Sequence, residues 1–141
     1  MSEVRDWPRI AVVGAGAVGG YFGGTLARAG APTVFIGRKH FVEAVNSKGL
    51  VLDKSEGQQR IAGTATTDFG AVRDCSLILF CVKAHATSAT AVQMAPFVRP
   101  DATVVCLQNG VDNAERVRAA TNIRSLPAVV YVAVSALSRV A

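Results

Sequence analysis

The feature that most constrains the fold is a glycine-rich turn close to the start of the 141-residue chain. Residues Gly14 to Gly19 read Gly-Ala-Gly-Ala-Val-Gly, which fits the pattern G-x-G-x-x-G. The turn directly follows the short β-rich run Arg9–Val13 and opens a predicted helix over Ala17–Ala29. The pattern alone is weak, but a strand before it and a helix after it are typical of a turn that binds a dinucleotide.

Each glycine of the turn has its own expected role. Gly14 permits a tight turn, Gly16 lets a pyrophosphate approach the backbone, and Gly19 lets the helix pack closely on the strand. The helix N-terminus offers N–H groups and a positive dipole end to the phosphates. The phosphate loop of nucleotide hydrolases is disfavoured, because Gly20 and Tyr21 stand where that loop needs Lys and Ser or Thr. The alternative is a glycine-rich turn in an α/β protein that binds no ligand.

The rest of the chain alternates between strand and helix patterns. The run Cys75–Val82 has no polar alternation, which is typical of a strand buried on both faces of a parallel sheet. The other expected elements are a strand over Thr33–Ile36, a helix over Lys39–Ser47, a hairpin-like excursion within residues 50–70, a helix over Thr87–Phe97, a strand over Thr103–Leu107, a helix over Asp112–Ala120 and a strand over Ala128–Val134. This alternation predicts one α/β domain over residues 1–141, with a doubly wound, mainly parallel sheet of the Rossmann type.

Composition and charge exclude several other classes of protein. Half of the residues are hydrophobic and 18% are charged, which is too apolar for a disordered chain. The net charge of +5 is spread along the chain, without the basic cluster that would indicate nucleic-acid binding. The uncharged stretch Ile10–Ala27 contains six glycines, so it would make a poor membrane-spanning helix. We therefore expect neither nucleic acid nor a membrane as a partner.

The cysteines and histidines give no sign of a metal site or a nucleophile. Cys75, Cys81 and Cys106 are too few for the disulfide framework of a small secreted protein, which favours buried thiols in a reducing cytoplasm. No Cys/His cluster has the spacing of a zinc site. Cys81 lacks a nearby activating partner, and His85 has no neighbouring acid, so we expect both to play ordinary structural roles.

The end of the second strand distinguishes the two nicotinamide cofactors. An NAD enzyme places Asp or Glu there, about 20 residues beyond the glycines, to hold the ribose 2′-hydroxyl. Here Phe35–Lys39 contains no acid, and Arg38 lies 19 residues after Gly19. A guanidinium binds a 2′-phosphate bidentately, so the segment predicts NADP(H). The alternative is that Arg38 and Lys39 are a solvated first helical turn, although that position is electrostatically poor for cations.

Polar residues follow two other predicted strands. Lys83 comes directly after one apolar run, and Gln108, Asn109 and Gly110 come after the next. In open α/β sheets, ligands bind beyond the carboxyl ends of the strands, so both segments are expected beside the cofactor. The alternatives are that Lys83 is a solvated strand end and that Asn109 and Gly110 form a simple turn.

These residues together resemble the N-terminal domain of the ketopantoate reductases, also called 2-dehydropantoate 2-reductases. The resemblance covers essentially the whole chain, and four segments carry it: Gly14–Gly20, Gly37–Arg38, Cys81–Ala84 and Leu107–Val111. That family reduces a 2-oxo acid to a 2-hydroxy acid with NADPH, on the route to pantothenate. The resemblance therefore implies an NADP(H)-dependent oxidoreductase with a small-molecule 2-oxo acid as substrate.

The resemblance also implies roles for individual residues. Arg38 would hold the 2′-phosphate, and Ala133 falls where the last strand of the family's domain touches the cofactor. Lys83 would approach the cofactor ribose and the active site, and Asn109 would hydrogen-bond near the nicotinamide and the substrate, which makes these two the candidate catalytic residues. The pyrophosphate would lie on Gly14, Ala15, Gly16, Ala17, Val18 and Gly19.

In this family a second, helical domain follows and supplies a lysine as general acid, together with an acidic residue for the substrate. Neither maps onto this chain, so we expect the cofactor-binding half of a two-domain enzyme, with the helical domain absent, as in a truncated or split enzyme. One alternative is a stand-alone NADP(H)-binding or sensing module without catalysis. Another is the same domain of a dehydrogenase that acts on a different 2-oxo acid. An apolar surface left where the helical domain would dock would favour a homodimer.

Overall fold

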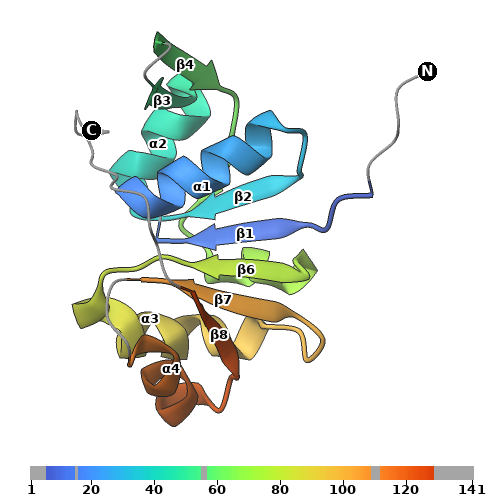
Figure 1. The fold of residues 1–141 in the computed structure, drawn as a ribbon, viewed down its shortest axis with the longest axis vertical. Coiled ribbons are helices and arrows are strands. Elements are labelled where there is room, and N and C mark those ends of the chain that lie inside the picture. The colour runs from blue at the N-terminus through green and yellow to red at the C-terminus, as the bar shows by residue number, and fades with distance from the viewer. Residues whose placement is uncertain (1–5, 15, 55–56, 109–111, 129–141) are drawn as a thin grey trace.

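The computed structural model describes residues 6–14, 16–54, 57–108 and 112–128. Within them, six parallel strands form one sheet in the order β5-β2-β1-β6-β7-β8 (Figure 1). The strands are β1 (Ile10–Val13), β2 (Thr33–Ile36), β5 (Thr64–Thr66), β6 (Leu77–Phe80), β7 (Thr103–Leu107) and β8 (Ser125–Ala128). Numbered along the chain, these six strands lie in the order 3-2-1-4-5-6, which is that of dinucleotide-binding sheets. The predicted doubly wound sheet is confirmed.

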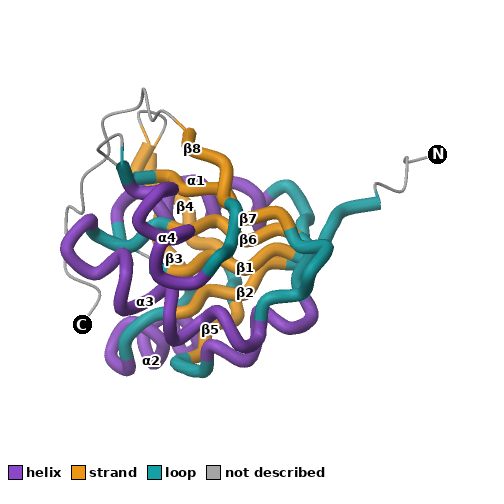
Figure 2. The backbone as a smooth tube through the Cα atoms, turned by 90° about the horizontal axis from the view of Figure 1, so that it is seen from below, coloured by secondary structure: helices purple, strands orange, loops and turns teal. Residues whose placement is uncertain are grey.

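Helices lie on both sides of the strands (Figure 2). One face carries α1 (Ala17–Arg28), α2 (Lys39–Lys48) and the antiparallel hairpin of β3 (Leu50–Lys54) and β4 (Gly57–Ile61). The opposite face carries α3 (Thr87–Met94) and α4 (Asn113–Thr121). Short 3-10 helices complete the described elements at η1 (Phe69–Asp74), η2 (Ala84–Ala86) and η3 (Ala95–Phe97).

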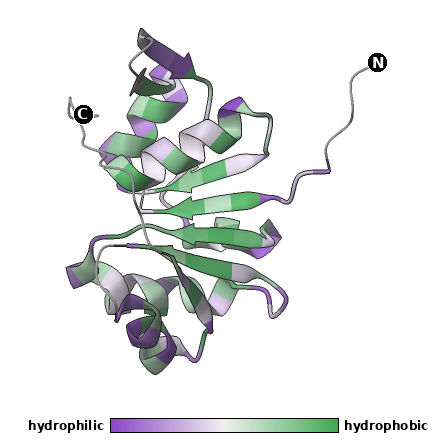
Figure 3. Cartoon of the chain, in the orientation of Figure 1, coloured by the Kyte–Doolittle hydropathy of each residue, from purple (hydrophilic) through white to green (hydrophobic). Residues whose placement is uncertain are grey.

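The central strands contribute side chains to two separate cores. Ala11 and Val13 of β1 are buried in the core beneath α3 and α4, whereas Ile10 and Val12 are buried in the core beneath α1 and α2. Such alternation on a strand buried on both faces explains why the apolar run before Lys83 has no polar positions. In Figure 3, the central strands form a hydrophobic band between helices that carry more polar residues. The structure shortens the predicted strand Cys75–Val82 to β6, although the Cys81 N–H still donates to the Val13 carbonyl of β1.

The edges of the sheet differ from the sequence expectations. The polar strand β5 was not predicted, and it pairs only with β2. On its open side, the Asn46 side chain donates to the Ala65 carbonyl at 3.0 Å and accepts from the Ala65 N–H at 2.9 Å, in place of a further strand. At the other edge, β8 covers Ser125–Ala128, whereas the sequence predicted a strand over Ala128–Val134. Only Ala128 of the predicted strand can be compared, because residues 129–134 lie outside the described part. Leu126 of β8 is 58% exposed.

Two further differences concern helices. The helix predicted over Thr87–Phe97 is α-helical only to Met94 and then continues as η3, because Pro96 has no N–H to donate. The six-residue η1 was not predicted, and the Asp68 carboxylate caps it by accepting from the Gly70 N–H at 2.8 Å. Within the described part of the chain, no helix has the length and apolar character needed to cross a membrane.

Candidate functional site

The carboxyl ends of the parallel strands place the predicted site residues along one edge of the sheet. Val13, the last residue of β1, lies opposite Ile36 of β2 on one side and Phe80 of β6 on the other. The segments that follow these three strands therefore leave the sheet side by side. The helices after β1 and β6 cover opposite faces, so the strand order reverses at β1 and β6. Ligands of doubly wound sheets bind at this position.

The turn after β1 requires a glycine at its first position. Gly14 has a φ of +83°, a conformation that L side chains rarely adopt. A Cβ atom there would lie 2.6 Å from Val82 Cγ1 and 2.7 Å from the Val82 backbone nitrogen. The Gly14 N–H donates to the Ile36 carbonyl at 3.0 Å, and the Cys81 N–H donates to the Val13 carbonyl at 2.7 Å. The turn is therefore held between the ends of its two neighbouring strands.

The start of α1 combines close packing with an open approach. A Cβ on Gly19 would lie 2.6 Å from the Gly14 carbonyl oxygen, so only glycine lets the helix begin this close to the turn. Gly16 is exposed, and a Cβ there would meet no atom within 4 Å among the described residues. Gly16 is also the N-cap of α1, with no side-chain cap and no acidic residue in the first turn. The helix N-terminus is thus open to an external anion.

Of the remaining residues of the predicted pyrophosphate loop, the structure describes Ala17 and Val18. Ala17 and Val18 form the first turn of α1 and are partly buried. Ala15 lies outside the described residues.

Arg38 lies between β2 and α2, two residues after the strand end. Its side chain is exposed and has no ion-pair or hydrogen-bond partner among the described residues. It is the N-cap of α2, whose first turn contains Lys39 and His40, both exposed, and no acid. Cations are disfavoured at a helix N-terminus, and no acidic side chain in the first turn of α2 offsets these basic residues. A bound anion would neutralise this positive charge.

Lys83 follows β6 and is the residue that precedes the short helix η2. Its carbonyl accepts from the Ala86 N–H at 2.9 Å, while its side chain is exposed and unpaired within the described part of the chain. His85, two residues further on, is also exposed. The other two predicted contacts, Asn109 and Ala133, lie outside the described residues.

The thiols beside this edge are not suited to nucleophilic chemistry. Burial raises the pKa of Cys81 to about 12, with the Cys106 thiol contributing in the same direction. Burial also raises the pKa of Cys106, although its hydrogen bond with the Ser125 hydroxyl at 3.3 Å opposes this. Both groups therefore stay protonated at neutral pH, as the sequence reasoning expected of Cys81.

Sequence reasoning missed a group of buried polar residues behind Lys83. Thr87, Gln108 and Asn113 are all at least 92% buried, and their side chains are linked by hydrogen bonds. Gln108 was noted as a polar residue at a strand end, but no local pattern links it to Thr87, which lies 21 residues earlier.

Comparison with known proteins decides the family. A family model described as "Ketopantoate reductase PanE/ApbA" matches residues 10–140, which is most of the chain. The chain belongs to the ketopantoate reductase family. The match corresponds to the N-terminal part of ketopantoate reductases, which agrees with the resemblance found in the sequence.

Individual ketopantoate reductases support this at both the sequence and the structure level. The 2-dehydropantoate 2-reductase of Pyrococcus horikoshii is 34% identical over 109 residues, which cover 77% of this chain and 35% of that protein. The crystal structure of a PanE/ApbA family ketopantoate reductase from Ralstonia eutropha JMP134 superposes with a TM-score of 0.85 and 38% identity, over 94% of this chain and 44% of that chain. For 2-dehydropantoate 2-reductase from Porphyromonas gingivalis W83, the TM-score is 0.76 at 28% identity, over 89% and 47% of the two chains. The chain thus spans less than half the length of these ketopantoate reductases.

Proposed function

We propose that this chain is the NADPH-binding domain of an oxidoreductase that reduces a 2-oxo acid to a 2-hydroxy acid, as ketopantoate reductases do. The observation that carries the proposal is the pairing of two anion-accepting features on adjacent strand ends. One is the uncapped N-terminus of α1 at Gly16, and the other is the unpaired guanidinium of Arg38 after β2. In dinucleotide-binding sheets, the pyrophosphate lies at the first of these positions and the adenosine ribose at the second.

The chemistry of Arg38 supports the phosphorylated form of the cofactor. A guanidinium donates two parallel hydrogen bonds to a phosphate, and the absence of Asp or Glu from Phe35–Lys39 removes the usual partner of an unmodified ribose. Lys39 and His40 add positive potential at the same helix start. NADPH is therefore the proposed cofactor, held by Gly14, Gly16 and Gly19 at its pyrophosphate and by Arg38 at its 2′-phosphate.

Lys83 and Asn109 are the residues of this chain proposed to reach the reacting end. When bound, NADPH supplies the hydride to the carbonyl carbon of the 2-oxo acid. Lys83, exposed at the end of β6, has an ammonium group that can stabilise the negative charge developing on the carbonyl oxygen or donate a proton to it. In ketopantoate reductases the general acid is expected from the helical domain, so full turnover is proposed to need that domain.

The proposed setting is the reducing cytoplasm. The three cysteines of the chain, all within the described residues, are free thiols, two of them buried. A homodimer through the face that carries exposed Leu126 is the proposed assembly.

Two measurements on the same protein sample test this function. NADPH fluorescence titration is expected to give saturable binding, and NADPH absorbance with added ketopantoate reports turnover. Binding with turnover supports catalysis by this chain alone, whereas binding without turnover rules out such autonomous catalysis and leaves a domain that binds the cofactor. No saturable NADPH binding at millimolar concentration would contradict the proposed function in both forms.

A further inference from the structure

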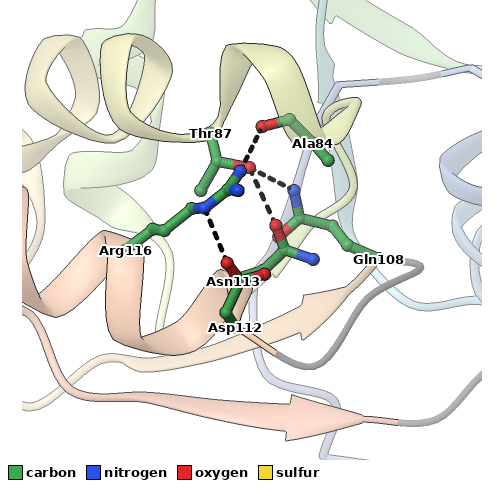
Figure 4. A network of polar contacts seen from close by, with 6 residues as sticks. All are labelled: Ala84, Thr87, Gln108, Asp112, Asn113 and Arg116. Atoms are coloured by element: carbon green, nitrogen blue, oxygen red, sulfur yellow. Dashed lines mark hydrogen bonds and ion pairs between the residues drawn. The ribbon is translucent and has the colours of Figure 1, made fainter.

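A buried threonine joins three segments of the chain behind Lys83 (Figure 4). Thr87 is the first residue of α3 and has no exposed surface. Its hydroxyl oxygen accepts a hydrogen bond from Gln108 Nε2 at 2.8 Å and lies 3.3 Å from Asn113 Oδ1, to which it donates. Gln108 directly follows β7, and Asn113 is the first residue of α4. The hydroxyl therefore links α3, β7 and α4.

Two separate sets of contacts hold the backbone on either side of Lys83. Gln108 Nε2 donates a second hydrogen bond, at 2.8 Å, to the carbonyl of Val82, the residue before Lys83. Arg116 Nη1 donates at 3.2 Å to the carbonyl of Ala84, the residue after Lys83, and Arg116 Nε also pairs with the Asp112 carboxylate at 3.1 Å. Lys83 thus lies between two carbonyl groups that are fixed from β7 and α4.

The two attachments differ in strength. Arg116 is exposed, so its hydrogen bond and ion pair are screened by water and contribute little. Thr87 and Gln108 are buried, where an unpaired polar group costs about 1–3 kcal/mol, so their hydrogen bonds favour one arrangement strongly. Gln108 Oε1 is also buried, without a hydrogen-bond partner among the described residues, so replacing Gln108 would change more than its bond to Thr87. Thr87 is therefore the residue on which the network can be tested cleanly.

We propose that Thr87, with Gln108, is a positioning residue that holds Lys83 in place to meet the nicotinamide half of the cofactor. This rests on the proposed function, because it assigns Lys83 to the bound dinucleotide. Thr87 acts through Gln108 on the Val82 carbonyl and not by contact with the cofactor. Its loss is therefore expected to weaken contacts at the nicotinamide end while the phosphate contacts of the glycine turn and Arg38 remain.

The test compares two ligands that differ in the nicotinamide half. Binding of NADPH and of adenosine 2′,5′-bisphosphate, which lacks nicotinamide, is measured by calorimetry well below the unfolding temperature. Thr87→Val removes the hydroxyl at nearly constant volume and is expected to weaken NADPH about five- to tenfold, with less than a twofold change for the bisphosphate. Thr87→Ser keeps the hydroxyl and is expected to bind both ligands within twofold of the unmodified chain.

The control is Thr121→Val, at the far end of α4. Its hydroxyl donates to the Val117 carbonyl at 2.6 Å and accepts from the Ile123 N–H at 3.1 Å, so the same substitution also removes two hydrogen bonds. We expect this variant to lose thermal stability and to bind both ligands normally. If Thr121→Val weakened NADPH as much as Thr87→Val, the effect would be general destabilisation and the positioning role would be wrong.

A double-mutant cycle asks whether Thr87 acts through Lys83. In a Lys83→Gln background, Thr87→Val is expected to change NADPH affinity by less than twofold, because the side chain that it positions is gone. An undiminished effect in that background, or an equal loss for both ligands, would overturn the inference. If the unmodified chain binds neither ligand, the proposed function fails and the inference fails with it.

A second variant covers the case in which Thr87→Val does not fold. Arg116→Ala alters an exposed side chain and removes its bond to the Ala84 carbonyl together with its exposed ion pair to Asp112. It is expected to weaken NADPH two- to threefold and to leave the bisphosphate unchanged. Unchanged NADPH binding in this variant would contradict the premise that a fixed backbone beside Lys83 is needed for binding at the nicotinamide end.

Discussion

At the scale of single residues, the proposed preference for NADPH rests on Arg38. A charge-assisted hydrogen bond contributes about 1.5–3 kcal/mol, so Arg38→Ala is expected to weaken NADPH roughly 10- to 100-fold. NADH has no 2′-phosphate, and its affinity is expected to change by less than about threefold. Titration of both dinucleotides checks this, with Arg28→Ala as control because Arg28 is exposed at the opposite end of α1. An equal loss of NADPH and NADH affinity would mean that Arg38 does not contact the 2′-phosphate.

Cys81 gives a second prediction at this scale. Because burial raises its pKa from 9.0 to about 12, the thiolate fraction at pH 8 is roughly a thousandfold lower than for a solvated cysteine. We expect iodoacetamide to modify Cys81 far more slowly in the native protein than in urea, as followed by mass spectrometry of the labelled peptide. Equal rates in the two states would show that the thiol is exposed at the edge of the sheet.

At the scale of elements, the face that α1 turns towards the sheet is made of glycine. A Cβ on Gly23 would lie 2.6 Å from Phe35 Cε1 and 2.7 Å from Val12 Cγ2, both on fully buried residues. Overpacking costs about 1–3 kcal/mol, and the better helix propensity of alanine returns about 1 kcal/mol, so Gly23→Ala is expected to destabilise the fold by up to about 2 kcal/mol. Urea unfolding followed by circular dichroism measures this. Thr25→Ala, at an exposed position of α1, should change stability by no more than about 0.5 kcal/mol, and a stabilised Gly23→Ala would contradict the packing.

The elements that could be predicted are those whose signals are local. The apolar runs of β1, β6 and β7 predicted the sheet, and the glycines predicted the turn at Gly14. Burial on both faces excludes polar residues from a strand, and a positive φ favours glycine. Strand β5 has no apolar pattern that would predict it, because it is polar and its backbone is bonded by the side chain of Asn46. The bond between Gln108 and Thr87 could not be predicted either, because the fold brings together residues that are distant in the sequence.

At the scale of the whole molecule, the two ends of the sheet offer different surfaces. The carboxyl end carries the glycine turn, Arg38 and Lys83. Near the amino ends of β7 and β8, a surface cavity of about 340 Å³ is bordered by Arg99 and Arg124 among others. Arg99 is already paired with Asp101 at 2.8 Å, so its charge is largely matched within the chain. We therefore propose that the dinucleotide binds at the carboxyl end alone.

The most direct test of this placement is an NMR titration of the isotope-labelled chain with NADPH, in which each backbone amide reports on its own surroundings. The predicted result is that saturable shifts concentrate on the amides of residues 14–19, 37–39 and 82–84. The shifts around Arg38 should be smaller with NADH, which lacks the 2′-phosphate. Shifts centred instead on Arg99 and Arg124, or no saturable shifts at all, would contradict the account.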